Sequence, residues 1–186
     1  MKRALVVIAV LALAAFAVWI VATDQAAPVG DSAPATTRPA TDPLPATGGI
    51  PVPADAEQMT VVSVHDGDTL DLRDRTGSVE TVRVIGIDTP EIHPEYECFG
   101  DEATAELERL APVGSTLRVA TDEDPFDDYD RLLLYLWNDD DVFVNLALVD
   151  GGFAEAIRVA PNDAYFDDLR AAEDAAAGAG LGMWSC

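Results

Sequence analysis

Lysine is almost absent from this chain. Lys2 is the only lysine in 186 residues, and lysine and arginine together number 11 against 34 aspartates and glutamates. Residues 57–186 hold eight arginines and 30 acidic residues, a formal charge of −22. This balance excludes attraction of a polyanion through a broad basic surface, which is how proteins usually meet nucleic acid. Such a surface suits concentrated salt, where repulsion is screened, but an acidic exported protein without that adaptation has the same composition.

Cysteine is nearly as scarce, since Cys98 and Cys186 are the only two. No C-x-x-C pair occurs, and a site built from His93 and both cysteines would lack a fourth ligand, which argues against zinc. In an exported protein an even cysteine count favours a disulfide. A Cys98–Cys186 bridge would tie the last residue to an internal loop, and closing a loop of roughly 90 residues is worth about 4–5 kcal/mol in the chain-entropy account.

A long run without charge lies at the amino terminus, where residues 4–22 follow Lys2 and Arg3. Residues 1–23 are therefore expected to be a signal peptide or an N-terminal membrane anchor. The length of the run favours the anchor, and the basic pair keeps the short amino-terminal side in the cytoplasm. Both alternatives export the rest of the chain, which predicts an extracellular or cell-surface protein.

Residues 24–56 consist mainly of alanine, proline, threonine and other small residues. A segment of this composition buries too little apolar surface to fold, so it is expected to be a disordered linker. One folded domain remains, at residues 57–186.

The apolar pattern of this domain predicts an α+β fold. β-type runs occur at residues 59–64, 69–73, 79–87, 116–120 and 131–137. Amphipathic spacing predicts three helices, over residues 100–110, 142–153 and 165–176, with Gly151-Gly152 ending the second. This order of elements fits a five-stranded Greek-key β-barrel of the OB type with three helices.

Two acidic clusters, Asp66-Gly67-Asp68-Thr69 and Asp88-Thr89-Pro90-Glu91, lie at the ends of β-type runs. Carboxylate and carbonyl oxygens suit a hard cation such as Ca²⁺, and phosphodiester cleavage also needs a base and guanidinium groups. The residues predict a metal-dependent phosphodiesterase in which Asp68 and Asp88 hold the ion, Glu91 activates water, and Arg83 and Arg131 clamp the phosphate. Taken singly, an Asp-Gly-Asp turn is more often a solvated hairpin and a strand arginine a structural ion-pair partner. Their joint spacing favours the site.

The position of Arg83 sets a geometric condition on this site. A regular strand over residues 79–87 would place Arg83 and Asp88 on opposite faces. They can share a site only if the strand bulges near Gly86 or ends before Asp88.

Six motifs in this order resemble the thermonuclease family of secreted, calcium-dependent micrococcal-type nucleases. The similarity covers about residues 58–186 and is carried by Asp66–Thr69, Arg83 with Asp88–Glu91, Phe99–Ala103, Asp128–Arg131, Val144-Asn145 with Gly152, and Leu181–Ser185. Each motif alone is weak, whereas six in this order and spacing are specific.

The resemblance implies roles for individual residues. Asp68 and Asp88 match the carboxylate ligands of Ca²⁺, and Thr89 matches the residue whose backbone carbonyl completes the set. Arg83 and Arg131 match the pair that grips the scissile phosphate, and Glu91 matches the residue assigned to water activation. Two further matches are Asp66, an acid near the metal, and Tyr129, a residue near the substrate phosphate.

The resemblance also implies the substrate, DNA and/or RNA, with a preference for single-stranded or frayed DNA and for RNA. Departures from the family pattern lie in substrate binding: Ile157 and Arg158 stand where a stacking tyrosine is common, and Asp128 and Asp130 replace a lysine and a glycine. We expect a monomer that contacts a membrane if residues 1–23 are uncleaved. The alternative is a noncatalytic, surface-tethered calcium-binding OB-type module that binds a protein or polymer partner. The charge of −22 favours this alternative, and the complete set of Arg83, Glu91 and Arg131 opposes it.

Overall fold

A closed barrel of five strands is the centre of the fold. The computed structural model describes residues 49–93 and 96–186, and its barrel strands follow the order β1-β2-β3-β6-β5, with β5 paired back to β1. The strands are β1 (Glu57–Val64), β2 (Thr69–Arg73), β3 (Val79–Val84), β5 (Thr116–Ala120) and β6 (Leu132–Trp137). All neighbours are antiparallel except β3 and β6, which run parallel. The barrel and its three helices confirm the predicted α+β fold of the OB type.

The run predicted as one strand over residues 79–87 forms two strands. β3 ends at Val84, and β4 (Ile87–Asp88) leaves the barrel to pair with β7 (Glu155–Ala156) in a separate two-stranded sheet. Gly86 makes the bend with a φ of 78°. A Cβ there would also lie 2.8 Å from Leu169 Cδ1. The bend thus meets the geometric condition for placing Arg83 and Asp88 together.

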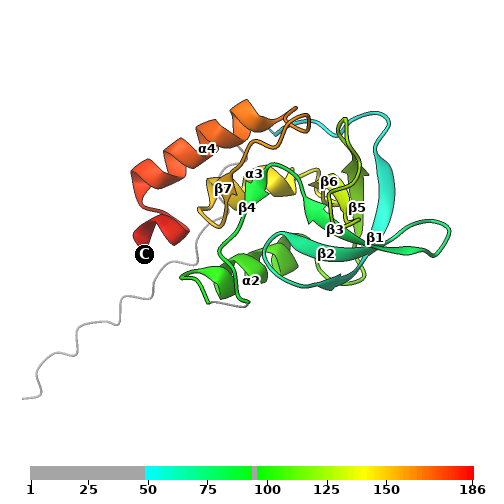
Figure 1. Cartoon of the computed structure of the whole chain (residues 1–186), viewed down its shortest axis with the longest axis horizontal. Coiled ribbons are helices and arrows are strands. Elements are labelled where there is room, and N and C mark those ends of the chain that lie inside the picture. Colours follow the sequence, from blue (N-terminus) through cyan, green and yellow to red (C-terminus); the bar gives the residue numbers. More distant parts are fainter. Residues whose placement is uncertain (1–48, 94–95) are drawn as a thin grey trace, which may run out of the picture. The chain divides into compact units, whose positions relative to one another are not determined.

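The helices α2 (Gly100–Leu110), α3 (Val144–Asp150) and α4 (Phe166–Ala179) lie beside the barrel, as Figure 1 shows. α2 packs against α3 and β1, α3 also packs against β6, and α4 covers α3 and β7. α3 begins later than predicted because Val142 belongs to a turn, in which its N–H donates to Asn138 Oδ1 at 3.1 Å. α4 continues past the predicted end to Ala179, and Gly180 directly after it adopts a φ of 63°.

A short 3₁₀ helix, η1 (Gly182–Ser185), follows α4 and was not predicted. It brings the carboxyl terminus to the start of α2, where Cys186 and Cys98 form a disulfide with their Cα atoms 6.4 Å apart.

The packed domain begins earlier than residue 57. Ile50 and Val52 pack against the barrel core, and the Ile50 carbonyl accepts a hydrogen bond of 2.9 Å from Trp137 Nε1. Residues 49–56 therefore belong to the domain rather than to the predicted disordered linker, because apolar residues within them find partners that composition alone does not reveal. The predicted leader at residues 1–23 and the linker up to residue 48 lie outside the described residues. None of the helices in residues 49–93 and 96–186 is long and apolar enough to cross a membrane.

Candidate active site

The turn between β1 and β2 carries the first acidic cluster. Asp66 Oδ1 accepts a hydrogen bond of 3.0 Å from the Asp68 N–H, which closes the turn on itself. The Asp68 carbonyl accepts a second bond, of 2.9 Å, from the Val84 N–H at the end of β3. A Cβ on Gly67 would lie 2.8 Å from Thr89 Oγ1 and 2.9 Å from Ala103 Cβ, so glycine permits the close approach of the turn to the second cluster and to α2.

Arg83 joins the two clusters. Its Nη1 donates to the carbonyls of Val84 and Ile87 at 2.7 and 2.8 Å, which spans the β3–β4 bend. Its Nη2 lies 2.8 Å from Asp88 Oδ1 and 3.1 Å from Asp68 Oδ2. The Arg83 side chain is only 13% exposed, and it lies at the rim of the barrel, where the turn Asp66–Thr69 and the turn Asp88–Glu91 meet.

The Asp68 carboxylate is buried, and both of its oxygens accept hydrogen bonds. Its Oδ2 accepts hydrogen bonds of 3.1 Å from both the N–H and the hydroxyl of Thr89, and its Oδ1 accepts one of 3.1 Å from the Thr69 hydroxyl. Together with Arg83, these donors hold Asp68, Asp88 and Thr89 in one small volume. The structure thus brings together the three residues that the sequence predicts as metal ligands.

Negative charge exceeds positive charge at this rim. Burial raises the pKa of Asp68 to about 6 against the opposing effect of Arg83, and the charge of Asp66 raises it further. Burial also raises the pKa of Glu91, as do the neighbouring charges of Asp66 and Asp88. The negative charges of Asp66 and Asp88 therefore act on the Glu91 carboxylate.

The backbone of Glu91 is held by a reciprocal contact with Glu97. The Glu91 N–H donates to Glu97 Oε2 at 3.0 Å, and the Glu97 N–H donates to the Glu91 carbonyl at 2.8 Å. A Cβ on Gly100 would lie 3.0 Å from the carbonyl oxygens of Pro90 and Glu91, which explains the glycine at the start of α2. Within residues 49–93 and 96–186, the Glu91 carboxylate accepts no hydrogen bond and remains available to a ligand.

Arg131 and Tyr129 form a second group at the start of β6. Arg131 Cζ lies 5.6 Å from the centre of the Tyr129 ring, and Arg131 Nε pairs with Asp127 Oδ2 at 2.7 Å. No ion pair within the described residues joins Arg131 to Arg83's carboxylate partners. Arg83 is nevertheless opposite Leu133 in the parallel β3–β6 pair, so Arg131, which directly precedes β6, is two residues from the position paired with Arg83.

The carboxylate and carbonyl oxygens of Asp68, Asp88 and Thr89 are of a type that suits a hard cation. In residues 49–93 and 96–186 no group of three or more His, Cys, Asp or Glu side chains is close enough together to hold a metal ion. The Arg83 guanidinium contacts both Asp68 and Asp88. Two carboxylates and the backbone carbonyl of Thr89 are nevertheless the ligand types that Ca²⁺ prefers. Burial is the main cause of the raised pKa of Asp68, and the negative charge of Asp66 adds to it. A divalent cation would neutralise this neighbouring negative charge. The residues present therefore fit such an ion.

Three residues with contacts to the site were not assigned roles from sequence: Asp127, Glu97 and Asn145. Asp127 and Glu97 have no distinguishing signal among so many acidic residues. Asn145 has one, because it is a polar residue at a position of α3 where the helix is apolar. It is fully buried, its Oδ1 accepts from the Leu136 N–H at 3.0 Å, and its Nδ2 donates to the Ile85 carbonyl at 2.8 Å.

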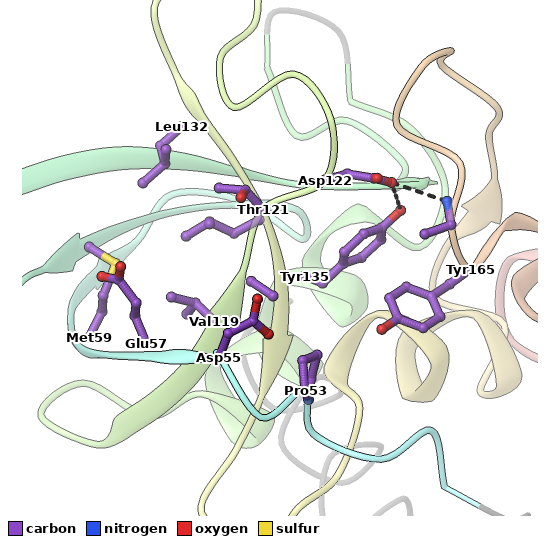
Figure 2. Close-up of a pocket in the computed structure, with 13 residues that line it drawn as sticks. Pro53, Asp55, Glu57, Met59, Val119, Thr121, Asp122, Leu132, Tyr135 and Tyr165 are labelled. Carbon is purple, nitrogen blue, oxygen red and sulfur yellow. Dashed lines mark hydrogen bonds between the residues drawn. The ribbon is translucent and has the colours of Figure 1, made fainter.

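A separate hollow of about 580 Å³ contains none of the predicted site residues. Figure 2 shows the Tyr135 hydroxyl directed at Asp122, with Tyr165 beside it. The Ala164 N–H also donates to Asp122 Oδ2, at 3.1 Å. Asp55, Glu57 and Asp122 line this hollow without any basic residue. Its charge would repel phosphate, so we do not place the nucleic-acid site here.

Comparison with known proteins gives a consistent family. The family described as staphylococcal nuclease homologue matches residues 81–186. A thermonuclease of Staphylococcus intermedius is 34% identical over 131 residues, which are 69% of this chain and 76% of the relative. A thermonuclease of Staphylococcus hyicus is 31% identical over 71% of this chain and 78% of the relative. Endonuclease YncB of Bacillus subtilis is 31% identical over 68% of this chain and 61% of the relative. The chain therefore belongs to the staphylococcal nuclease homologue family.

Proposed function

We propose that this protein is an exported, calcium-dependent nuclease that hydrolyses phosphodiester bonds of DNA and/or RNA. The observation that carries the proposal is the contact of one largely buried guanidinium, that of Arg83, with the carboxylates of both Asp68 and Asp88. The names of the relatives, thermonuclease and endonuclease, support the same class of reaction.

Asp68, Asp88 and the backbone carbonyl of Thr89 would hold the Ca²⁺ ion, with Asp66 beside them. When bound, the ion supplies positive charge that polarises the phosphate. Arg83 already contacts both carboxylates, so its guanidinium would lie beside such an ion.

The side chains around this rim supply the remaining chemistry. Glu91, with its raised pKa and its available carboxylate, accepts the proton of the attacking water. Arg83 and Arg131 donate hydrogen bonds to the phosphate oxygens as negative charge develops on them. Arg131 uses Nε for Asp127, so its two Nη groups are the donors we assign to the phosphate. Tyr129, which is 81% exposed, lies beside them for contact with the nucleotide.

Two variants test the metal assignment. Asp68→Ala or Asp88→Ala removes one of only two carboxylate ligands, so calorimetry should show loss of Ca²⁺ binding and a gel assay on single-stranded DNA should show loss of cleavage. Asp140→Ala, in an exposed acidic loop, is the control and should change neither. Unchanged calcium affinity in both site variants would remove Asp68 and Asp88 from the metal site.

A noncatalytic calcium-binding module remains the second candidate, and the charge of −22 in residues 57–186 favours it. The same gel assay separates the two candidates. Calcium binding without cleavage, in Ca²⁺ and at both low and molar salt, would establish the module instead of the enzyme. Cleavage that stops in chelator and in Glu91→Gln would establish the enzyme.

Export as a secreted or membrane-anchored protein is proposed from residues 1–23, and a monomer is a separate expectation. Cell fractionation with mass spectrometry of the mature chain tests this point. Recovery of the whole chain, unprocessed, from the cytosol would contradict it.

A further inference from the structure

Glu97 connects the proposed base to the disulfide. Its side chain and its backbone N–H both bind the backbone of Glu91, at 3.0 and 2.8 Å. The next residue, Cys98, is bonded to Cys186, 88 positions later in the chain. The residue that holds the backbone of Glu91 is therefore directly adjacent to the disulfide.

The Cys186 end of the disulfide is held against the segment that follows α3. Cys186 directly follows η1, and the Met183 N–H of η1 donates to the Gly152 carbonyl at 2.9 Å. The backbones at Gly152 and Gly182 approach so closely that a Cβ on either residue would clash with the other segment. The disulfide thus ties Glu97 to a segment that is packed on the end of α3.

The proposed metal ligands do not depend on this tie. Asp68, Asp88 and Thr89 are held by Arg83 and by one another, within the turns at the rim of the barrel. None of these contacts involves residues 96–99 or 182–186. Opening the disulfide should therefore affect Glu91 selectively.

We propose that the Cys98–Cys186 disulfide positions Glu91 through Glu97 and makes turnover sensitive to thiols. This inference rests on the proposed function, in which Glu91 is the base. Both cysteines are exposed, so a small thiol can reach the bond. A thiolate of dithiothreitol attacks one cysteine sulfur and breaks the S–S bond, and its second thiolate then resolves the mixed disulfide. Two electrons and two protons pass to Cys98 and Cys186, and the reagent leaves as its cyclic disulfide.

The test compares oxidised and dithiothreitol-reduced protein at a temperature where circular dichroism shows both to be folded. A displacement of about 1 Å of a reacting group costs on the order of a hundredfold in rate, so we expect kcat to fall by about tenfold to a hundredfold on reduction. KM and the calorimetric affinity for Ca²⁺ should stay unchanged. The double variant Cys98→Ser with Cys186→Ser should have the low kcat with and without the reagent.

Variants of Glu97 separate positioning from general stability. Glu97→Ala should reproduce the low kcat with the disulfide intact, whereas Glu97→Gln retains a side-chain acceptor and should restore most of the rate. Val119→Ala shortens a buried side chain in β5 and is the control for lost stability, with kcat preserved while folded.

The outcomes distinguish this inference from the function on which it rests. Equal kcat before and after reduction, with an inactive Glu91→Gln, would overturn the role of the disulfide and leave the nuclease intact. A parallel loss of Ca²⁺ affinity and kcat on reduction would also overturn it, because it would mark a general structural effect. Full activity of Glu91→Gln would instead remove the base assignment, and the disulfide's role with it.

Discussion

At the scale of single residues, the charged form of the Asp68 carboxylate is disfavoured in the folded protein. Its pKa lies near 6 in the folded protein instead of 3.8, because burial disfavours the charged form more than Arg83 favours it. Between these two values the folded state binds more protons than the unfolded state, so this group's contribution to stability is lost as pH rises toward neutrality.

This pKa predicts the effect of Asp68→Asn in chelator. Because the amide has no charge to bury, we expect the free energy of unfolding at pH 7 to rise by about 1–3 kcal/mol relative to the wild type. The difference should shrink as pH falls and vanish only below both pKa values, where Asp68 is protonated in the folded and in the unfolded state. Urea denaturation at pH 7 and at lower pH checks this, and an Asp68→Asn variant less stable at pH 7 than the wild type would contradict it.

The two arginines are predicted to act through the shape of their guanidinium groups. Arg83→Lys and Arg131→Lys should each fold but lose about a hundredfold or more in kcat, since an ammonium cannot donate two parallel hydrogen bonds to a phosphate. Steady-state kinetics on single-stranded DNA provide the measurement. Arg75→Lys, in an exposed turn, is the matched control. A near wild-type rate in either site variant would exclude that arginine from the chemistry.

At the scale of the elements, Asn145 links three parts of the fold. From α3 it reaches the backbone of β6 at Leu136 and the β3–β4 bend at Ile85, and that bend sets the position of Asp88 relative to Arg83.

Asn145→Ala should therefore reduce both stability and turnover. Leaving a buried N–H and a buried carbonyl without partners should cost about 2–4 kcal/mol in the free energy of unfolding. Loss of the link should also lower kcat in protein that is still folded. Asn162→Ala is the control: Asn162 is also buried and makes two backbone hydrogen bonds of 2.8 Å, both to Asp124 and none to the bend. An equal loss of kcat in both variants would show that the link to the bend has no special role.

At the scale of the whole molecule, net charge should govern the response to salt. Nucleic-acid binders ordinarily lose affinity steeply as salt rises, since counterion release drives binding. In residues 57–186, with a charge of −22, repulsion within the domain and toward the polyanion is instead relieved by salt.

Cleavage at fixed free Ca²⁺ should hold steady or rise up to roughly molar salt, before the local phosphate contacts are screened. Rates measured across a salt series, with circular dichroism to verify folding, check this. A steep fall from the lowest salt in folded protein would mean that a local basic groove dominates the acidic surface.

Much of this protein could be predicted from its sequence, because its signals are local. Period-two and helical spacing predicted the barrel strands and the three helices, and residues such as Leu107 and Leu169 are buried as that spacing requires. The acidic turns and Arg83 could be named as site candidates because the chemistry of a cation and a phosphate demands those residue types.

Contacts between distant segments could not be predicted in this way. Several contacts depend on which surfaces meet after folding. They are the hydrogen bond from Trp137 to the Ile50 carbonyl, the ion pair of Arg131 with Asp127, and the hydrogen bond from Asn145 to the Ile85 carbonyl. The break in the strand at Gly86 is of the same kind. The residues around Gly86 are apolar on both sides, so the sequence pattern predicts one continuous strand. The chain turns at Gly86 because β4 pairs with β7, about 70 residues later in the sequence. Local periodicity carries no information about a pairing over that distance.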